Sequence, residues 1–464
     1  MINVSNTPLE SGLYTGLGHT TNPMLEDNVT NINLLGFLFT FLMGVLILFL
    51  PRRYALIPII ITTCYMTVGQ QIVIVMFHFT ILRIVIFFGW IRVTIRKEIS
   101  SIRLNVIDKT IIWWVIASVV TYTLLYWTSA DFINRLGFAY NVMGLYFLFR
   151  VFIRNFEDIE RTIKFFSIII VPLACAMLME NATGRNFFSI FGGVPEITEM
   201  RDMKLRCQGP FLHPILVGTF GATLIPLFLG LLIKGKSDRV KALMGLGAAT
   251  IITVTSSSSG PILSYLFGII GLCLWRFRNN MRAIGLGVVF SLIGLHIVMK
   301  DPVWYLMARI SNLIGGKGWY RSYLIDQTVA HFSEWWLIGT KNTSQWMPFY
   351  FEWSNKADIT NQYIGEAVNG GLFKLVLFIV VIVLCFRGIG RGLRFKQNQP
   401  FATKIILWGM GSALFAHVVS FFSVAYFDQI IVSWFLLLAM ISNINSKSTK
   451  MEIINSRNNE QKTG

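Results

Sequence analysis

Side chains that can hold an anion gather in the nine residues RCQGPFLHP, numbered 206–214. Arg206, Gln208 and His213 fall within eight positions, where a polar stretch runs into a long apolar one. A guanidinium grips phosphate through paired charge-assisted hydrogen bonds, and the helix start that Pro214 indicates offers free backbone N–H groups with the same preference. We therefore expect Arg206 to bind an anion with Gln208 beside it, although contact with lipid headgroups would also explain this arginine. His213 is either a proton-transfer group or a hydrogen-bonding cap.

A second stretch of this kind runs from Gly315 to Thr340, GGKGWYRSYLIDQTVAHFSEWWLIGT. Aromatic and aliphatic residues at helical spacing predict an amphipathic helix at the surface. Its cationic residues Arg321 and Lys317 could meet Arg206 above a cavity, and His331 is a candidate base. The alternative for Arg321 is an ion pair with Asp326 or with lipid phosphate.

Two further stretches could line the same cavity. DITNQYIGEAVNGGL, residues 358–372, supplies Asp358, Asn361 and Glu366, and TSSSSGP, residues 255–261, supplies serines that line a wet pocket or satisfy the backbone at a broken helix. The sequence has no nucleophile elbow, Walker, Rossmann or HExxH pattern and no metal-ligand spacing, so we expect neither a metal nor a cofactor.

The composition decides the class of protein that must position these residues. Hydrophobic residues make up 54% of the 464 residues and charged residues only 14%, and the mean hydropathy is +0.61. Soluble proteins carry roughly 25% charged residues. Because alternating strand patterns are missing and apolar runs of about 17 to 25 residues recur, the sequence predicts an all-α polytopic membrane bundle of about 12–14 transmembrane helices.

The chain divides into a polar N-terminal tail at 1–32, a membrane domain at 33–443 and a basic, polar tail at 444–464. We expect thirteen spans, at about 33–50, 54–70, 72–91, 111–128, 134–153, 164–180, 211–233, 242–255, 260–275, 283–299, 373–388, 403–424 and 427–443. The segment 242–275 could instead be one span followed by a re-entrant hairpin.

Loop charges set the orientation of these spans. Lys and Arg concentrate in alternate loops, such as RVTIRKEISSIR, KGKSDRVK and RGIGRGLRFK, which the positive-inside rule assigns to the cytoplasm together with the basic tail. The long loops at about 181–210 and 300–372 are then extracytoplasmic. This distribution accounts for the formal charge of +17, so nucleic acid is not an expected partner. Mid-span charges are nearly limited to Arg83, which either holds a lipid-linked anion or pairs within the bundle.

In this order, several motifs resemble those of the O-antigen ligase and polysaccharide polymerase superfamily. The motif R-x-x-G-x-x-x-H-P before a span is matched by Arg206 to Pro214, and an arginine followed by an aromatic-rich helix with a glycine turn is matched by Arg321 to Gly339. A serine-rich hairpin motif is matched by Ser257, Ser259 and Gly260, and the motif H-N-x-Y-L…G is matched by Asn361, Tyr363, Ile364 and Gly371. The likeness covers residues 200–440, and the first 200 residues agree in hydropathy only.

The resemblance implies a metal-independent glycosyltransferase of the bacterial inner membrane. Its donor would be a glycan on undecaprenyl diphosphate, its acceptor a second glycan at the outer face, and its lipid partner the bilayer. Chain-length regulators and flippase proteins are further candidate partners. By analogy Arg206 and Arg321 would hold the diphosphate, while Gln208, His213, Ser257, Ser259, Lys317, Asn361 and Tyr363 would bind substrate.

The chain departs from the family pattern at its proposed base. The family histidine of H-N-x-Y-L is Thr360 here, the acidic residue before the final glycine is Asn369, and the arginine of S-x-S-R-G is Ser259. These differences favour a polymerase over a lipid-A ligase, and they leave Asp358, Glu366 and His331 as candidate bases. The rival functions are a transporter or flippase of lipid-linked sugars and a membrane scaffold without catalysis.

Overall fold

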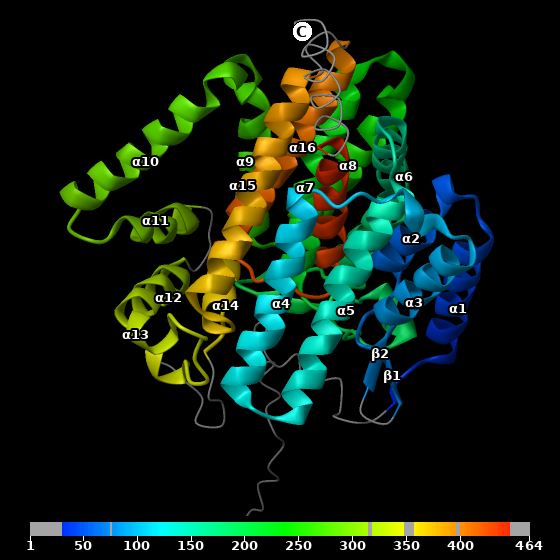
Figure 1. Cartoon of the computed structure of the whole chain (residues 1–464), viewed down its shortest axis with the longest axis horizontal. Helices are drawn as coiled ribbons and strands as arrows, with labels where there is room; N and C mark the ends of the chain where they lie inside the picture. The colour runs from blue at the N-terminus through cyan, green and yellow to red at the C-terminus, as the bar shows by residue number, and fades with distance from the viewer. Residues whose placement is uncertain (1–29, 75–76, 314–317, 348–356, 396–399, 446–464) are drawn as a thin grey trace, which may run out of the picture.

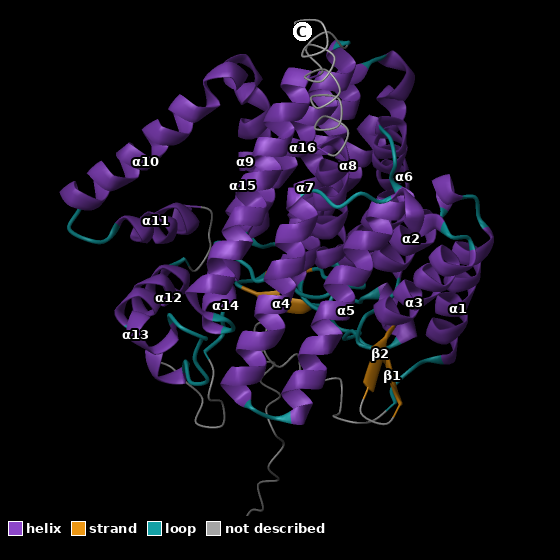
Figure 2. Ribbon diagram, in the orientation of Figure 1, coloured by secondary structure: helices purple, strands orange, loops and turns teal. Residues whose placement is uncertain are grey.

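The computed structural model describes residues 30–74, 77–313, 318–347, 357–395 and 400–445, and these residues fold into a bundle of helices with two short β-hairpins (Figures 1 and 2). The first half of the bundle consists of α1 (Leu34–Phe49), α2 (Ile57–Tyr65), the hairpin β1 (Gln71–Ile74) and β2 (Phe77–Thr80), α3 (Ile81–Ile95), α4 (Val106–Tyr126), α5 (Ser129–Phe152) and α6 (Phe156–Thr183). The second hairpin, β3 (Glu199–Arg201) and β4 (Lys204–Arg206), precedes α7 (Pro214–Lys234), α8 (Arg239–Thr255) and α9 (Ser259–Cys273).

The remaining helices form a lobe and then return to the bundle. They are α10 (Met281–Val298), α11 (Leu306–Leu313), α12 (Trp319–Ala330), α13 (Phe332–Trp335), α14 (Gln362–Val368), α15 (Gly371–Phe395), α16 (Phe401–Ser420) and an unlabelled terminal helix, Ile430–Asn445. Figure 1 shows α10 leaning away from the bundle, with α11, α12 and α13 below it, and α10 has no buried residue.

Polar residues at helix starts explain where several helices begin. Asn105 and Asp108 form a capping box at α4, in which each side chain accepts a hydrogen bond from the other residue's backbone N–H. Asn33, Thr128 and Asn155 cap α1, α5 and α6 in the same way with one side-chain oxygen each. These caps satisfy backbone groups that an apolar environment would otherwise leave unpaired.

Every predicted span overlaps a helix, which confirms the all-α bundle. Six helical segments among the described residues are long and apolar enough to cross a membrane: Val106–Tyr126, Phe156–Thr183, Pro214–Lys234, Ser259–Val298, Gly371–Arg394 and Phe401–Ser420. Leu34–Phe49 and Ile430–Asn445 are shorter apolar helices. This composition indicates a multi-pass membrane protein.

One predicted span differs from the structure. Residues 72–74 and 77–80 of the predicted span 72–91 belong to the strands β1 and β2, so the helix begins only at Ile81. The apolar run cannot distinguish the two because Ile, Val and Phe suit a short strand as well as a helix. The segment 242–275 forms the two helices that the predicted spans 242–255 and 260–275 require, α8 and α9, and both pack against α7.

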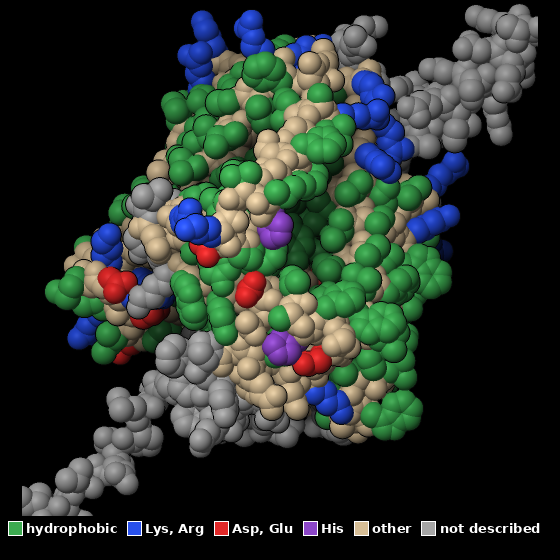
Figure 3. Space-filling view, turned by 90° about the vertical axis from the view of Figure 1, so that its left-hand side faces the viewer, with side chains coloured by type: hydrophobic (Ala, Val, Ile, Leu, Met, Phe, Trp, Pro, Cys, Tyr) green, Lys and Arg blue, Asp and Glu red, His purple; other side chains and the backbone are tan. Residues whose placement is uncertain are grey.

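The loops sort to opposite ends of the bundle. In Figure 1 the α9–α10 connection and the junction region of α15 and α16 lie at the top, whereas the α4–α5 turn, the β1–β2 hairpin and α12–α13 lie at the bottom. Lys and Arg gather at the upper end of the face in Figure 3, with apolar side chains covering the band below them. This arrangement agrees with the division of the loops by charge.

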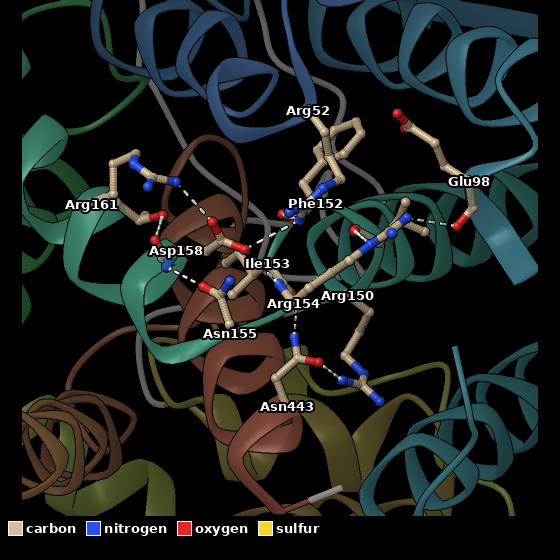
Figure 4. A network of polar contacts seen from close by, with 12 residues as sticks. Arg52, Glu98, Arg150, Phe152, Ile153, Arg154, Asn155, Asp158, Arg161 and Asn443 are labelled. Carbon is tan, nitrogen blue, oxygen red and sulfur yellow. Dashed lines mark hydrogen bonds and ion pairs between the residues drawn. The ribbon is translucent and has the colours of Figure 1, made fainter. Parts of the chain in front are cut away.

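A polar network at the upper, basic end ties four elements together (Figure 4). Asp158 of α6 accepts hydrogen bonds from Arg52 at 3.2 Å and from Arg161 at 2.8 Å. Asn443 of the terminal helix accepts from Arg150 of α5 and donates to the carbonyl of Ile153 at 2.6 Å. Because all these residues satisfy one another, we assign this network to stability.

Two hydrophobic clusters lie beneath this polar shell. The larger runs through α2 to α8, α15, α16 and the terminal helix, and the smaller holds the lobe to α14 through Leu324, Trp335, Trp346, Ile364 and Val368. The lobe is fixed where Gly339 and Gly371, both with positive φ, let the backbone of 335–340 pass against 368–372. A β-carbon on Gly339 would lie 2.1 Å from the Val368 carbonyl oxygen, so only glycine fits there.

Candidate functional site

The loop 206–213 is held by one carboxylate at the end of α6. Glu180 accepts hydrogen bonds from the backbone N–H of Gln208 at 3.0 Å and of Gly209 at 2.9 Å, and from the Thr198 hydroxyl at 3.2 Å. Gly209 has a φ of 56°, and its carbonyl accepts from Asn186 at 2.7 Å. The amide of Gln208 donates to a carbonyl of its own loop, so Gln208 shapes this loop from within.

Arg206 is presented by a tight β-hairpin. Asp202 and Met203, with φ of 50° and 60°, form the two-residue connection between β3 and β4. This turn sets Glu199 opposite Arg206, whose Nη1 donates to both carboxylate oxygens at 2.8 and 2.9 Å. The Arg206 side chain is 7% exposed and that of Glu199 45%, so a buried cation is neutralised by a carboxylate that reaches solvent.

The serine turn between α8 and α9 packs against this hairpin. Arg206 Nη2 donates to the Ser258 hydroxyl at 3.1 Å, while Ser257 uses its hydroxyl to hold the Leu205 carbonyl at 2.7 Å. Ser259 lies 3.5 Å from the Ser311 hydroxyl and joins α9 to α11. The turn therefore supports Arg206. The serine that contacts Arg206 directly is Ser258, which is not one of the residues matched to the serine-rich hairpin motif.

His213 is the N-cap of α7. Its Nδ1 accepts the backbone N–H of Ile215 at 3.1 Å. Burial, with a smaller effect from the charges of Arg206 and Arg201, lowers the pKa of His213 to about 3. The ring is therefore neutral at physiological pH, and of the two roles considered for it the structure favours the cap.

Arg321 and Asp358 come together at the same place. Tyr320 of α12 donates to the Asp358 carbonyl at 2.9 Å, which sets the segment before α14 beside this helix. Burial, together with the charges of Arg201 and Arg206, lowers the pKa of Arg321 to about 10, and Asp358 acts in the opposite direction. Burial raises the pKa of Asp358 to about 6 in spite of Arg321.

We call Arg201, Arg206, His213, Arg321 and Asp358 the arginine cluster. Two loops more than 100 residues apart in sequence supply its cations, which lie close enough to shift one another's ionisation. Each guanidinium group has a carboxylate near it: Glu199 pairs with Arg206, Asp202 lies 3.9 Å from Arg201, and Asp358 acts on Arg321. Because Glu199 and Asp202 reach solvent, where their charges are screened, the buried cations Arg206 and Arg321 can still attract an added anion.

Other predicted site residues lie elsewhere. His331 stacks on Trp346 at 5.2 Å and binds the Gln327 carbonyl, within the lobe. Lys317 lies outside the described residues. Asn361 caps α14 by accepting from two backbone N–H groups, and Tyr363 is fixed among Phe rings with its hydroxyl on the Val418 carbonyl at 3.1 Å.

Glu366 is committed to an internal ion pair. Its carboxylate lies 3.0 Å from the ammonium of Lys374, and both side chains are almost fully buried. It also accepts from the Trp114 indole at 3.0 Å and the Gln362 amide at 2.7 Å. With its oxygens occupied in this way, Glu366 is a poor candidate for a base.

Glu366 is one of the residues around a cavity of about 210 Å³ inside the bundle, which we call the central cavity. Its charged residues are Arg83, Arg135, Glu366 and Asp428, its amides are Asn134, Asn141 and Gln362, and its rings are Trp114, Phe138, Phe378, Phe421, Tyr426, Phe427, Trp434 and Phe435. Sequence reasoning singled out Arg83 and Glu366 but missed Arg135 and Asp428. Arg135 lies within two turns of the start of α5, where it could have been found as a cation on an apolar helix.

The sequence predicts that mid-span charges are nearly limited to Arg83, but the structure places Arg83 in the first turn of α3. Four further charged residues are buried near the ends of their helices: Arg135 and Arg150 of α5, Asp108 of α4 and Lys374 of α15. Hydropathy averaged over a window hides them, because the apolar residues around each charge outweigh it.

No protein-family model matches this chain, and a search of curated proteins finds no match to it.

Proposed function

We propose that this protein is a multi-pass glycosyltransferase of the bacterial inner membrane, with about thirteen spans. It transfers or polymerises glycan carried on undecaprenyl diphosphate at the outer face, and we favour a polysaccharide polymerase over a lipid-A ligase. The observation that carries the proposal is the arginine cluster, in which Arg206 and Arg321 meet beside Asp358 at the non-basic end of the bundle.

The proposed chemistry depends on the two buried cations of that cluster. An acceptor hydroxyl attacks the anomeric carbon of the donor, the bond from that carbon to the diphosphate oxygen breaks, and the diphosphate leaves with the electron pair. Arg206 and Arg321 stabilise the negative charge that develops on the leaving group. A base needs only to take the hydroxyl proton.

Asp358 is the best placed of the three candidate bases. Its raised pKa of about 6 leaves it ionised at neutral pH and closer to an effective value than an ordinary carboxylate. Glu366 is saturated by hydrogen bonds and His331 lies in the lobe, away from the cluster.

A transporter or flippase of lipid-linked sugars is the second candidate. The observation that favours it is the set of charged side chains around the central cavity, inside the bundle. Arg83 and Arg135 lie in the first two turns of α3 and α5, and Glu366 lies in the short helix α14, which favours a one-sided site over charges spread along a path through the bundle.

Deleting the gene and profiling the surface glycans separates these functions. Loss of long polymer with single repeats still attached would support the polymerase, and loss of all attached glycan would support the ligase. Accumulation of donor on the cytoplasmic leaflet would support the flippase and contradict the glycosyltransferase. An unchanged glycan profile would contradict all three.

A further inference from the structure

The central cavity is lined by residues from separate elements that the reaction at the arginine cluster does not use. It is bounded by α3, α4, α5, α14, α15 and the segment 421–435. It adjoins the cluster through one short link, since Leu212 lines the cavity and the next residue, His213, belongs to the cluster. Two distinct sites thus share the loop before α7.

Arg83 lines the cavity with its guanidinium packed against a glycine of α5. Its Nε donates to the Asn141 side chain at 3.2 Å and its Nη1 to the His78 carbonyl at 2.5 Å, and both of these partners are uncharged. No carboxylate of the described residues lies within ion-pair distance of Arg83. A β-carbon on Gly137 of α5 would lie 2.3 Å from its Nη2, so the guanidinium lies directly against this helix.

Arg135 supplies a second cation to the same wall. Its guanidinium stacks over the Tyr122 ring at 3.5 Å and near Phe138 at 5.6 Å, which orients it by cation–π contact. The charged groups that line the cavity are Arg83, Arg135, Glu366 and Asp428, and the Glu366 carboxylate is paired with Lys374 at 3.0 Å. Because the hydrogen-bond partners of the Arg83 guanidinium among the described residues are uncharged, the cavity favours a ligand with negative charge.

Asp428 lines the cavity beside Leu212 of the loop before α7. It sits in the connection before the terminal helix with a φ of 66°, and its Oδ2 accepts from the Leu212 N–H at 3.1 Å. Its Oδ1 is buried and has no hydrogen-bond partner among the described residues. A buried acceptor of this kind is costly unless a donor such as a ligand hydroxyl reaches it.

The rest of the wall suits a sugar ring. Trp114, Phe378, Tyr426 and Trp434 offer flat apolar faces, and the amides of Asn134, Asn141 and Gln362 offer donors and acceptors around them. Aromatic faces with a few placed polar groups are typical of pockets that bind a small, amphipathic ligand.

We propose that the central cavity binds an anionic sugar residue of the acceptor glycan, with Arg83 and Arg135 holding its negative group and Asp428 accepting a ring hydroxyl. This inference rests on the proposed function only where it calls the ligand the acceptor glycan. Binding of an anionic sugar in the cavity does not depend on the reaction that the arginine cluster performs. The negative group is either the carboxylate of a sugar acid or a phosphate on the sugar.

The test is direct binding to the purified full-length chain in nanodiscs of phosphatidylcholine, measured by calorimetry. The probes are glucuronate, glucose 1-phosphate and glucose, which share a ring and differ in charge. We expect glucuronate or glucose 1-phosphate to bind at least about tenfold more tightly than glucose, and the tighter of the two identifies the source of the charge. Equal binding of all three probes, or no saturable binding, overturns the proposal.

Variants locate the binding. Arg83→Gln and Arg135→Gln should reduce anion binding to the level of glucose, and Gly137→Ala should weaken it while keeping every charge, because the new methyl group displaces the Arg83 guanidinium. Gly247→Ala is the matched control, since it lies on α8 with no atom within 4 Å of the added carbon. If Arg321→Gln abolishes the binding and Arg135→Gln does not, the anion sits in the arginine cluster and the proposal is wrong.

The outcomes separate the two proposals. Selective binding that depends on Arg135, in a protein without transferase activity, would contradict the proposed function and leave the anion site standing. Transfer activity that is insensitive to Arg83→Gln and Arg135→Gln, without selective binding, would contradict the anion site alone.

Discussion

The arginine cluster and the central cavity lie on either side of Leu212, yet they are built differently. The cluster comes from the segments that connect the predicted spans, namely the β3–β4 hairpin, α12 and the residues before α14, and its cations lie near the carboxylates of Glu199, Asp202 and Asp358. The cavity comes from helices of the bundle, and its cations lie against rings and amides. Loops can be positioned around a leaving group that changes charge, whereas a cavity between helices selects the shape of what enters it.

The largest expected difference between the two sites is kinetic. Arg321→Gln should lower kcat by about 100-fold, because it removes stabilisation that is needed only when the diphosphate leaves. Arg135→Gln should instead raise the KM for acceptor with kcat nearly unchanged. The assay is transfer in proteoliposomes with lipid-linked glycan extracted from cells that lack the protein, and the reverse pattern of kcat and KM would contradict this division of roles.

A large effect on stability should come from the ion pair at the cavity wall. Lys374→Met leaves the buried carboxylate of Glu366 uncompensated, which costs roughly 3–5 kcal/mol in the free energy of unfolding. Glu366→Gln in the same chain should recover much of that loss. Unfolding in mixed detergent micelles measures both, and a double variant no more stable than Lys374→Met would show that the pair is not coupled.

The arginine cluster should respond to pH through Asp358. Its pKa is raised to about 6, so its contribution to folding is fully present below the ordinary value near 3.8 and is lost as pH rises through 6. Binding of a diphosphate should weaken as pH rises through 6, because the carboxylate that ionises there repels it. At pH near 7.5 the Asp358→Asn variant should bind farnesyl diphosphate about tenfold more tightly than the natural protein does. At pH near 5 the two proteins should bind it equally.

If both proteins show the same pH profile for farnesyl diphosphate, another group controls it. The comparison between the two proteins also cancels the ionisation of the probe itself.

The smallest expected effect concerns the carboxylate that already holds Arg206. Glu199→Gln should raise the affinity for farnesyl diphosphate by about two- to fivefold, since a half-exposed ion pair is worth little. The control is Glu196→Gln, which alters an exposed pair with Arg185 in the same loop. A lower affinity in Glu199→Gln would mean that Glu199 positions Arg206 for binding.

The two regions also differ in how far the sequence predicts them. Hydropathy and loop charge predict the helices and the ends at which they connect, because both patterns are local. The same locality revealed Arg206 and Arg321, since cations on the loops of the less basic end stand out. Local patterns do not distinguish the paired strands at 72–74 and 77–80 from a helix, because their Ile, Val and Phe residues are as apolar as those of a helix.

Tertiary contacts decided the rest of the site. The family motif predicts that Asn361 and Tyr363 bind substrate, but Asn361 caps α14 and the Tyr363 ring is packed in the bundle. A sequence motif does not show the direction in which a side chain points. Ser258 contacts Arg206 because the α8–α9 turn packs against the hairpin, and Glu199 contacts it because β3 pairs with β4. Arg135 and Asp428, almost 300 residues apart, line one cavity only after the chain has folded, which places the segment before the terminal helix beside Leu212.

The central claim is that the arginine cluster binds the diphosphate of a lipid-linked substrate. Its most direct test is the affinity of the purified chain for farnesyl diphosphate against farnesol, in the natural protein and in Arg206→Gln, Arg321→Gln and Arg185→Gln. Arg185 is the control, because its side chain is 75% exposed and lies in the same loop. We predict that the first two variants each bind farnesyl diphosphate at least about tenfold more weakly and that Arg185→Gln does not. Equal affinity in all four proteins, or equal binding of farnesol, would contradict the account.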